Sequence, residues 1–159
     1  MRRIILLAAL VALSIPAPAH DSTGPAAPHS AVPAAARGAA ATVDAFHAAL
    51  RRGDRKAAAA LLAEDALIFE EGGAERSKAE YAARHLPADA AFSQAVATTI
   101  TRRTGWSDGS FAWIATEGRM TGNWQGRRVE RLTTETMLLR RVGRAWRIMH
   151  IHWSSAPAR

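Results

Sequence analysis

Two segments of alternating hydrophobicity follow one another in the sequence RRVERLTTETMLLRRVGRAWRIMHIHWS, residues 127–154. Alternation with a period of two is typical of β-strands that are buried on one face. Residues 127–141 and 145–154 are therefore predicted to be strands. The segment Val142-Gly143-Arg144 between them is short and contains glycine, as a hairpin connection requires.

The same period extends towards the N-terminus, where residues 95–106 and 111–121 are predicted to be two further strands. Their connections, Ser107-Asp108-Gly109 and residues 122–126, are again short and contain glycine. Four successive strands joined in this way favour an antiparallel meander.

Helix signals come before the strands. Thr42 can cap a helix whose apolar residues follow i, i+3, i+4, i+7 spacing and which stops at Gly53. Asp54 can cap a second short helix over residues 55–63. A brief strand is then predicted over residues 67–69, before a glycine turn.

Ser77 can cap a third helix, which carries Tyr81 and His85 one turn apart. Pro87 interrupts this helix, and a further turn carries Phe92. Helices first and a meander second predict an α+β fold, with the N-terminal helices packed on one face of a curved, mainly antiparallel sheet.

Residues 1–19 have the three parts of a secretory signal peptide. Arg2 and Arg3 precede an apolar run over residues 4–15, and small residues lead to Ala19. The run is too short to cross a bilayer, which needs roughly twenty residues. We expect cleavage after Ala19, a periplasmic or secreted protein, and no stable membrane insertion after cleavage; the alternative is an uncleaved anchor.

Residues 20–38 are rich in proline, alanine and serine and contain almost no large apolar residue. Such a segment cannot offset its ordering entropy by burial, so it is predicted to be a disordered tether. The chain has 159 residues, which leaves room for one domain, placed at residues 39–155.

Charge and cysteine content exclude several classes of function. The 21 basic residues exceed the 14 acidic ones, but the arginines are dispersed as pairs rather than clustered. Dispersed charge, together with export, argues against nucleic acid as a partner. The absence of cysteine excludes disulfides, thiolate metal sites and cysteine nucleophiles.

Three motifs, in order, resemble one known family. They are Arg52-Gly53-Asp54 followed by Leu61-Leu62 and Asp65-Ala66, then Glu135-Thr136-Met137, and the closing strand from Trp146 to Ser154. Together they resemble the SnoaL-like branch of the nuclear transport factor 2-like superfamily. The ending is also similar to the association domain of calcium/calmodulin-dependent kinase, although Trp153 stands at that domain's arginine position.

The resemblance implies a cone-shaped fold whose helices close one side of a strongly bent sheet and leave a pocket at the wide end. It also implies dimers that form through the outer sheet face. Activities in this superfamily include polyketide cyclases, steroid isomerases, dehydratases and non-catalytic binding modules, so the fold does not decide the function.

His150 and His152 are the sharpest chemical feature. Residues i and i+2 of a strand point to the same face, so the two imidazoles are predicted to lie side by side. The same period places Trp146 and Ile148 on the histidine face, but it does not say which face lines the pocket. The pair can be catalytic together with Glu135, with His152 or Glu135 as the base in cofactor-free proton transfer. The alternative is a pair of buried, hydrogen-bonding residues.

A histidine cluster is the alternative chemistry. His85 can supply a third nitrogen beside His150 and His152, and three such ligands suit an open copper or zinc site. His47 is another candidate for the third ligand. In the leading hypothesis no metal or other cofactor is expected.

The leading hypothesis is an exported domain, homodimeric, that binds a small apolar or aromatic molecule in its cone. Besides the catalytic candidates, the residues expected to bind this ligand are Trp113, Trp146, Glu117, His85 and Tyr81. The alternatives are a metal-binding periplasmic protein and a non-catalytic dimerisation module.

Overall fold

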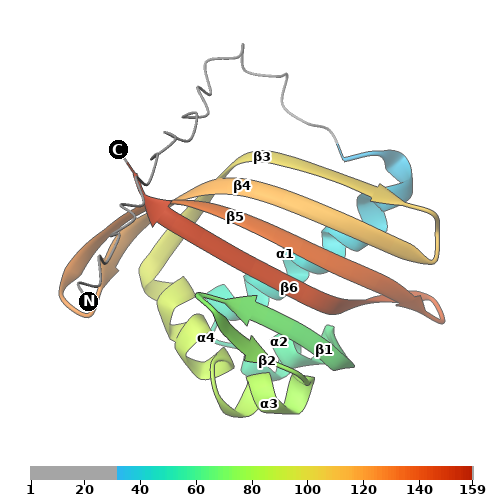
Figure 1. The fold of residues 1–159 in the computed structure, drawn as a ribbon, viewed down its shortest axis with the longest axis horizontal. Coiled ribbons are helices and arrows are strands. Elements are labelled where there is room, and N and C mark those ends of the chain that lie inside the picture. Colours follow the sequence, from blue (N-terminus) through green and yellow to red (C-terminus); the bar gives the residue numbers. More distant parts are fainter. Residues whose placement is uncertain (1–31, 159) are drawn as a thin grey trace, which may run out of the picture.

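The computed structural model describes residues 32–158, and helices precede a sheet of strands along the chain (Figure 1). The helical elements are η1 (Ala34–Ala36), α1 (Arg37–Arg51), α2 (Arg55–Ala60), α3 (Lys78–Ala83) and α4 (Leu86–Ala95). The strands are β1 (Leu62–Glu70), β2 (Gly73–Glu75), β3 (Val96–Ser107), β4 (Phe111–Trp124), β5 (Arg127–Val142) and β6 (Ala145–Pro157). The expected signal peptide, and residues 20–31 of the expected tether, lie outside the described residues.

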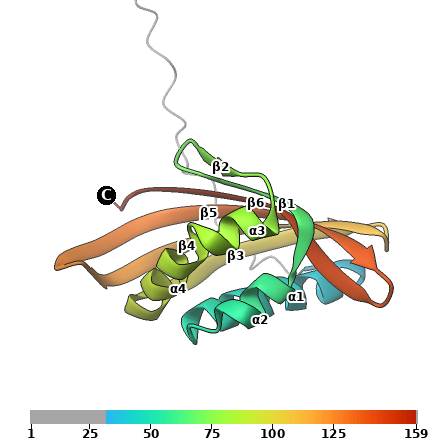
Figure 2. The same cartoon turned by 90° about the horizontal axis from the view of Figure 1, so that it is seen from below.

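The six strands form one sheet in the order β2-β1-β6-β5-β4-β3. Every neighbouring pair is antiparallel except β1 and β6, which are parallel. The sheet is bent, and the helices all lie against one of its faces, as Figures 1 and 2 show. The predicted α+β fold is confirmed, and the predicted four-strand meander corresponds to β3 to β6.

The ordered chain begins earlier than the sequence predicts. Residues 34–38, assigned to the tether, form η1 and the start of α1, and Ala36 is fully buried. Thr42 lies inside α1 rather than capping it, and its hydroxyl donates to the carbonyl of Gly38 at 3.3 Å. The reason is that alanine is the best helix former and its small side chain lets a helix lie close to a sheet, whereas the disorder rule counts large apolar residues.

Two predicted caps are confirmed. The side chain of Asp54 accepts a hydrogen bond from the N–H of Ala57, and that of Ser77 accepts one from the N–H of Glu80. After α2 the chain enters β1 at once, so β1 begins five residues before the predicted Leu67. The predicted break at Pro87 is the first turn of α4, where proline is tolerated because its missing N–H has no helical partner.

A bulge divides β6. Its register against β5 runs Leu139↔Ile148 and then Leu138↔His150, so Met149 is an extra residue on β6. Trp146 and Ile148 face the helices before the bulge, and Ile151 and Trp153 face them after it. The predicted sharing of one face by Trp146, Ile148 and the histidines is therefore wrong.

The hydrophobic core fills the space between the helices and the inner sheet face. Its largest fully buried side chains are Tyr81, Phe46, Ile68, Leu86, Ile114, Met137, Leu139, Ile148, Ile151 and Val43. Gly122 lets β3 and β4 approach closely where the sheet bends, because a Cβ there would lie 2.5 Å from the carbonyl oxygen of Ala95. None of the described helices is long and apolar enough to span a membrane.

Candidate functional site

A row of paired residues crosses the inner face of the sheet. The register places Arg103 opposite Thr116, Thr116 opposite Glu135, Glu135 opposite Trp153, and Trp153 beside Glu70. Directly paired residues point to the same face, so all five side chains point towards the helices. We call these five residues, from Arg103 to Glu70, the Glu135 row.

Glu135 is the most deeply buried ionisable group of this row, with 7% of its surface exposed. Its Oε2 accepts two hydrogen bonds, one from Nε1 of Trp153 at 2.7 Å and one from Nε2 of His47 at 2.7 Å. The other oxygen, Oε1, is buried and receives no hydrogen bond from any described residue. Oε2 is therefore fixed by two donors, and Oε1 can still accept a hydrogen bond.

Opposing effects set the pKa of Glu135. Burial raises this pKa, but the hydrogen bonds from His47 and Trp153 and the positive charge of Arg103 outweigh burial and lower it below its ordinary value. The carboxylate is accordingly ionised at neutral pH. An ionised carboxylate only accepts hydrogen bonds, so Nε2 of His47 carries a hydrogen and is the donor of this hydrogen bond.

Arg103 ties helix α1 to the row. Its Nε donates to Oγ1 of Thr116 at 3.1 Å, and its Nη1 donates to Asp44 of α1 at 2.5 Å. His47 lies one turn after Asp44 on the same helix. Two polar contacts from consecutive turns of α1 therefore hold this helix over the middle of the sheet.

A second polar group lies at the other end of the row, beneath α3 and α4. We define the Glu70 group as Glu70, Glu75, Tyr81, His85 and Asp89. The hydroxyl of Tyr81 donates to Oδ2 of Asp89 at 2.6 Å, and Nδ1 of His85 contacts the buried carboxylate of Glu75. The ring of Trp153 separates this group from Glu135, with Phe46 stacked at 6.4 Å and Tyr81 at 6.5 Å between ring centroids.

Two acids of the Glu70 group, Glu70 and Asp89, have raised pKa values. Partial burial, followed by repulsion from Asp89 and Glu71, raises the pKa of Glu70 to about 7. Burial also raises the pKa of Asp89. The row thus carries two carboxylates with pKa values displaced in opposite directions, on either side of one tryptophan.

The chain matches the SnoaL-like domain over residues 39–159. It belongs to the SnoaL-like domain family. Among solved structures, it is similar to a proposed ketosteroid isomerase from Shewanella frigidimarina, with 30% identity, a TM-score of 0.72, and coverage of 78% of this chain and 100% of that one.

Two further structures support the fold of this SnoaL-like domain, which belongs to the nuclear transport factor 2-like superfamily. One is a proposed calcium/calmodulin dependent protein kinase II association domain from Xanthomonas campestris, with 23% identity, a TM-score of 0.66, and coverage of 82% and 96%. The other is a proposed dehydratase from Streptomyces avermitilis, with 19% identity, a TM-score of 0.66, and coverage of 77% and 96%. Among proteins with curated descriptions, none matches the chain.

The two histidines of the closing strand lie on the outer face of the SnoaL-like domain, opposite Glu135. Nδ1 of His150 lies 2.9 Å from the carbonyl oxygen of Leu67, to which it donates. Both imidazoles contact the ring of Phe69, and His152 is exposed. The structure therefore brings Glu135 together with Trp153 rather than with the predicted pair.

The predicted three-histidine metal site is not formed. His85 contacts Glu75 on the helix side of the sheet, whereas His150 and His152 lie on the other side. No group of three or more metal-ligating side chains converges within residues 32–158. The His cluster cannot act as one metal centre in this arrangement.

The other predicted ligand residues are spread over the SnoaL-like domain. Trp113 and Glu117 lie on the outer face, where Glu117 is 3.8 Å from Arg102. Trp146 is buried in the core beneath the guanidinium of Arg141, 5.7 Å from the ring centroid. Of these residues only Tyr81 and His85 lie on the helix side near the row, as members of the Glu70 group.

Sequence reasoning missed the hydrogen-bonding partners of Glu135, His47 and Trp153, and the nearby charge of Arg103. His47 was considered only as a metal ligand, and Arg103 and Trp153 were not assigned to a site. The signal that identifies them is the strand register: Trp153 shares a face with Glu135 only because the bulge at Met149 shifts the period.

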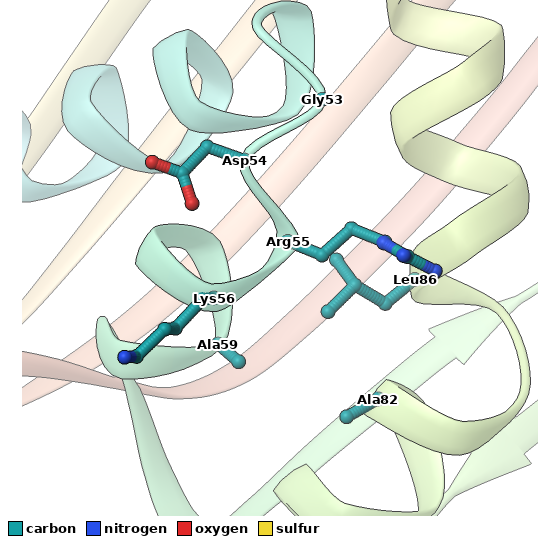
Figure 3. Close-up of a pocket in the computed structure, with 7 residues that line it drawn as sticks. All are labelled: Gly53, Asp54, Arg55, Lys56, Ala59, Ala82 and Leu86. Carbon is teal, nitrogen blue, oxygen red and sulfur yellow. The ribbon is translucent and has the colours of Figure 1, made fainter.

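Hollows open on the described surface of the SnoaL-like domain, two of them outside the Glu135 row. One, of about 480 Å³, lies between α2, α3 and α4 and is lined by Gly53, Asp54, Arg55, Lys56, Ala59, Ala82 and Leu86 (Figure 3). The other, of about 640 Å³, lies at the end of the β4–β5 hairpin. Neither of these two hollows is lined by a member of the Glu135 row. Solvent reaches the row at Glu70, which is exposed, and at His47, whose side chain is 30% exposed.

Proposed function

We propose that this SnoaL-like domain binds a small apolar or aromatic molecule between α1 and the sheet, with Glu135 as the acceptor of a ligand hydrogen bond. The observation that carries this proposal is the buried Oε1 of Glu135, which no described residue satisfies. A buried polar atom without a partner costs about 1–3 kcal/mol, and more when it is charged. A ligand O–H or N–H placed at Oε1 would recover this energy.

The surroundings of Glu135 favour a flat, largely apolar ligand. The indole of Trp153 lies beside the carboxylate, with the ring of Phe46 stacked on it, and buried Thr116 stands opposite Glu135 on the neighbouring strand. Aromatic rings bind other rings through their faces and edges. A ligand here would combine one hydrogen-bond donor with an apolar body.

The same arrangement supports cofactor-free proton transfer. Oε1 would take a proton from the ligand, while the donors at Oε2 hold the carboxylate in place. Glu70, whose pKa is about 7, is partly protonated at neutral pH and would return a proton to a ligand that extends past the ring of Trp153. Two carboxylates tuned in opposite directions are the usual way to supply a base and an acid at one pH.

The comparisons support this proposal at the level of the family. The structure with 30% identity is described as a proposed ketosteroid isomerase, and another is described as a proposed dehydratase. Both descriptions name reactions that move protons, and the cone of this fold is where such relatives of the SnoaL-like domain would bind small molecules.

The proposal is tested with 2-naphthol and naphthalene, two flat probes that differ by one hydroxyl. Binding of each is followed by probe fluorescence to the wild-type protein, Glu135→Gln and Glu117→Gln. We expect 2-naphthol to bind about tenfold or more tightly than naphthalene, because a hydrogen bond to a charged group contributes about 1.5–3 kcal/mol. Glu135→Gln should abolish this preference, and Glu117→Gln, on the outer face, should keep it. Equal binding of the two probes to the wild-type protein would contradict the proposal.

We propose also that the protein is exported. Residues 1–19 support this through their basic start, apolar run and small-residue end. Mass spectrometry of the protein recovered from the periplasm or medium should give a chain that begins at His20. Recovery of a chain that retains residues 1–19 would contradict cleavage.

We propose further that the domain forms a homodimer through its outer sheet face. Large apolar side chains stand exposed on this face, among them Trp106, Leu138 and Phe69. Contiguous exposed apolar side chains commonly mark interfaces between proteins. A second copy of the same face would cover them.

A further inference from the structure

The hollow at the end of the β4–β5 hairpin is separate from the Glu135 row and carries an excess of positive charge. Arg127, Arg128 and Arg131 line it, and Glu130 is the one acidic residue of its lining. Its other walls include Trp124 and Pro157. A hollow of about 640 Å³ is large enough for an anionic group with its hydration.

The backbone explains why this hollow exists. β6 pairs with β5 as far as Pro157↔Arg131, and the N–H of Ala158 donates to the carbonyl oxygen of Glu130 at 3.1 Å. The first residues of β5, 127–129, therefore extend beyond the described end of β6. The hairpin projects past this point (Figure 1). Its two-residue turn, with Gln125 and Gly126 at φ of 50° and 77°, is of the tight kind that matches the strand twist and fixes the end of the hairpin.

The side chains around the hollow are held in place. The ring of Trp124 meets Phe92 of α4 edge to face at 5.6 Å. Arg131 donates from Nε to Oγ of Ser155 at 2.9 Å and from Nη2 to its carbonyl oxygen at 3.1 Å. These two bonds use two of the five donors of a guanidinium.

Positive charge in this region is only partly compensated. Glu130 is shared by Arg128 at 3.2 Å and by Arg119 at 3.4 Å. Arg127 has no ion-pair partner within residues 32–158, and Arg131 has only the neutral partner Ser155. Three guanidinium groups against one carboxylate leave an excess of two positive charges in the lining of the hollow.

We infer that this hollow is a binding site for a phosphate-type dianion, with Arg127 and Arg131 as its cationic ligands and Trp124 as its wall. A phosphate monoester or a diphosphate carries close to two negative charges at neutral pH and several acceptor oxygens. A phosphate group has enough terminal oxygens to accept hydrogen bonds from two guanidinium groups at once, whereas a carboxylate has only two oxygens. The phosphate can belong to a soluble molecule or to the headgroup of an anionic lipid.

The experiment uses pyrophosphate as the soluble probe and vesicles of phosphatidylglycerol as the lipid probe. Succinate and vesicles of phosphatidylcholine are the reference probes. The variants are Arg127→Gln and, as a control with the same loss of charge, Arg144→Gln in the turn at the other end of β5. Calorimetry measures the soluble probes and co-sedimentation measures the vesicles.

We expect saturable binding of pyrophosphate, weakened about tenfold in Arg127→Gln by the loss of one charge-assisted hydrogen bond, and changed less than twofold in Arg144→Gln. Binding to phosphatidylglycerol alone, lost in Arg127→Gln and kept in Arg144→Gln, would also support the site and assign it to a lipid headgroup. Equal losses in the two variants would show a general charge effect and overturn the inference. Tighter binding of succinate than of pyrophosphate, or binding of neither phosphate probe, would overturn it as well.

Discussion

Trp153 and Glu135 stand directly opposite each other on neighbouring strands, and the indole N–H of Trp153 donates to the carboxylate at 2.7 Å. The tryptophan is therefore a donor to a buried charge as well as a part of the core. Trp153→Phe keeps most of the ring contact with Phe46 but removes the donor. We expect a loss of about 1–3 kcal/mol in the free energy of unfolding, because a buried carboxylate loses one of its two hydrogen bonds.

Urea unfolding at neutral pH measures this loss. The matched control is Trp106→Phe, in which an exposed tryptophan of the outer face loses the same N–H group. Both variants are made in the Leu138→Glu background, which removes the proposed dimer interface, and the control should then stay within about 0.5 kcal/mol of its parent protein. Equal stability of both variants would mean that the hydrogen bond to Glu135 contributes nothing.

The pH dependence of the unfolding free energy should reveal the lowered pKa of Glu135. Its pKa is lower in the folded protein than its ordinary value of 4.5, so its ionised form stabilises the fold at higher pH. This contribution is complete above about pH 4.5 and is lost as pH falls through the folded pKa. The difference in unfolding free energy between wild type and Glu135→Gln should be constant above this pH and should shrink below it. If the difference in unfolding free energy grew on acidification, the pKa of Glu135 would be raised rather than lowered by folding.

Glu70 should act in the opposite direction. Partial burial and neighbouring acids raise its pKa from the ordinary 4.5 to about 7 in the folded protein, so ionisation of Glu70 opposes folding. Stability should fall as pH rises from 4.5 to 7 and then level off. Glu70→Gln should remove this fall and melt higher than the wild type at pH values above 7, as measured by thermal unfolding across a pH series.

The control for Glu70 is its neighbour Glu71→Gln, which removes the same charge from the exposed turn before β2. Because Glu71 contributes to the raised pKa of Glu70, this control should raise the melting temperature slightly. A gain in Glu71→Gln as large as in Glu70→Gln would show that the fall in stability is a general charge effect.

Gly122 should tolerate no side chain. A Cβ there would lie 2.5 Å from the carbonyl oxygen of Ala95 and 2.9 Å from Cα of Val96, both backbone atoms that cannot move alone. We expect Gly122→Ala to lower the unfolding free energy by about 1–3 kcal/mol through overpacking. Urea unfolding checks this value. Thr121→Ala, at the adjacent exposed position, should change stability by less than about 0.5 kcal/mol, and a larger loss there would contradict the local crowding argument.

Self-association should depend on the outer face. Leu138 is 38% exposed in the middle of this face, so Leu138→Glu should leave the fold intact and place a charge in the proposed interface. Sedimentation should show a dimer for the wild type and a monomer for Leu138→Glu. Thr121→Glu, near the hairpin end of the same face, should remain a dimer. A wild-type monomer would contradict the proposed homodimer.

Strong local signals made much of the fold predictable. The glycine-containing turns and period-two segments located β3 to β6, and Asp54 and Ser77 marked two helix starts. β2 was missed because a strand of three residues carries almost no periodicity. The start of α1 was missed because its alanines resemble a low-complexity tether in composition while serving as helix formers.

The candidate site was less predictable, because it depends on strand register rather than on residue type. Glu135 was identified from its sequence neighbours, but its partners come from α1 and β6, far away in the chain. Periodicity fixed the faces of β6 only as far as Ile148, where the bulge interrupts it. The sequence of β6 alone does not reveal that Met149 has no partner residue on β5.

The extra residue at Met149 has a consequence for comparing this protein with its relatives. In a homologue that lacks this single residue, an otherwise identical ending would turn both histidines inward and Trp153 outward. A one-residue deletion would then replace the indole donor beside Glu135 with an imidazole, with no substitution at either position. Two homologues could therefore align letter for letter over His-x-His-Trp and still have different interiors, and the length of β6 has to be matched before its residues are equated.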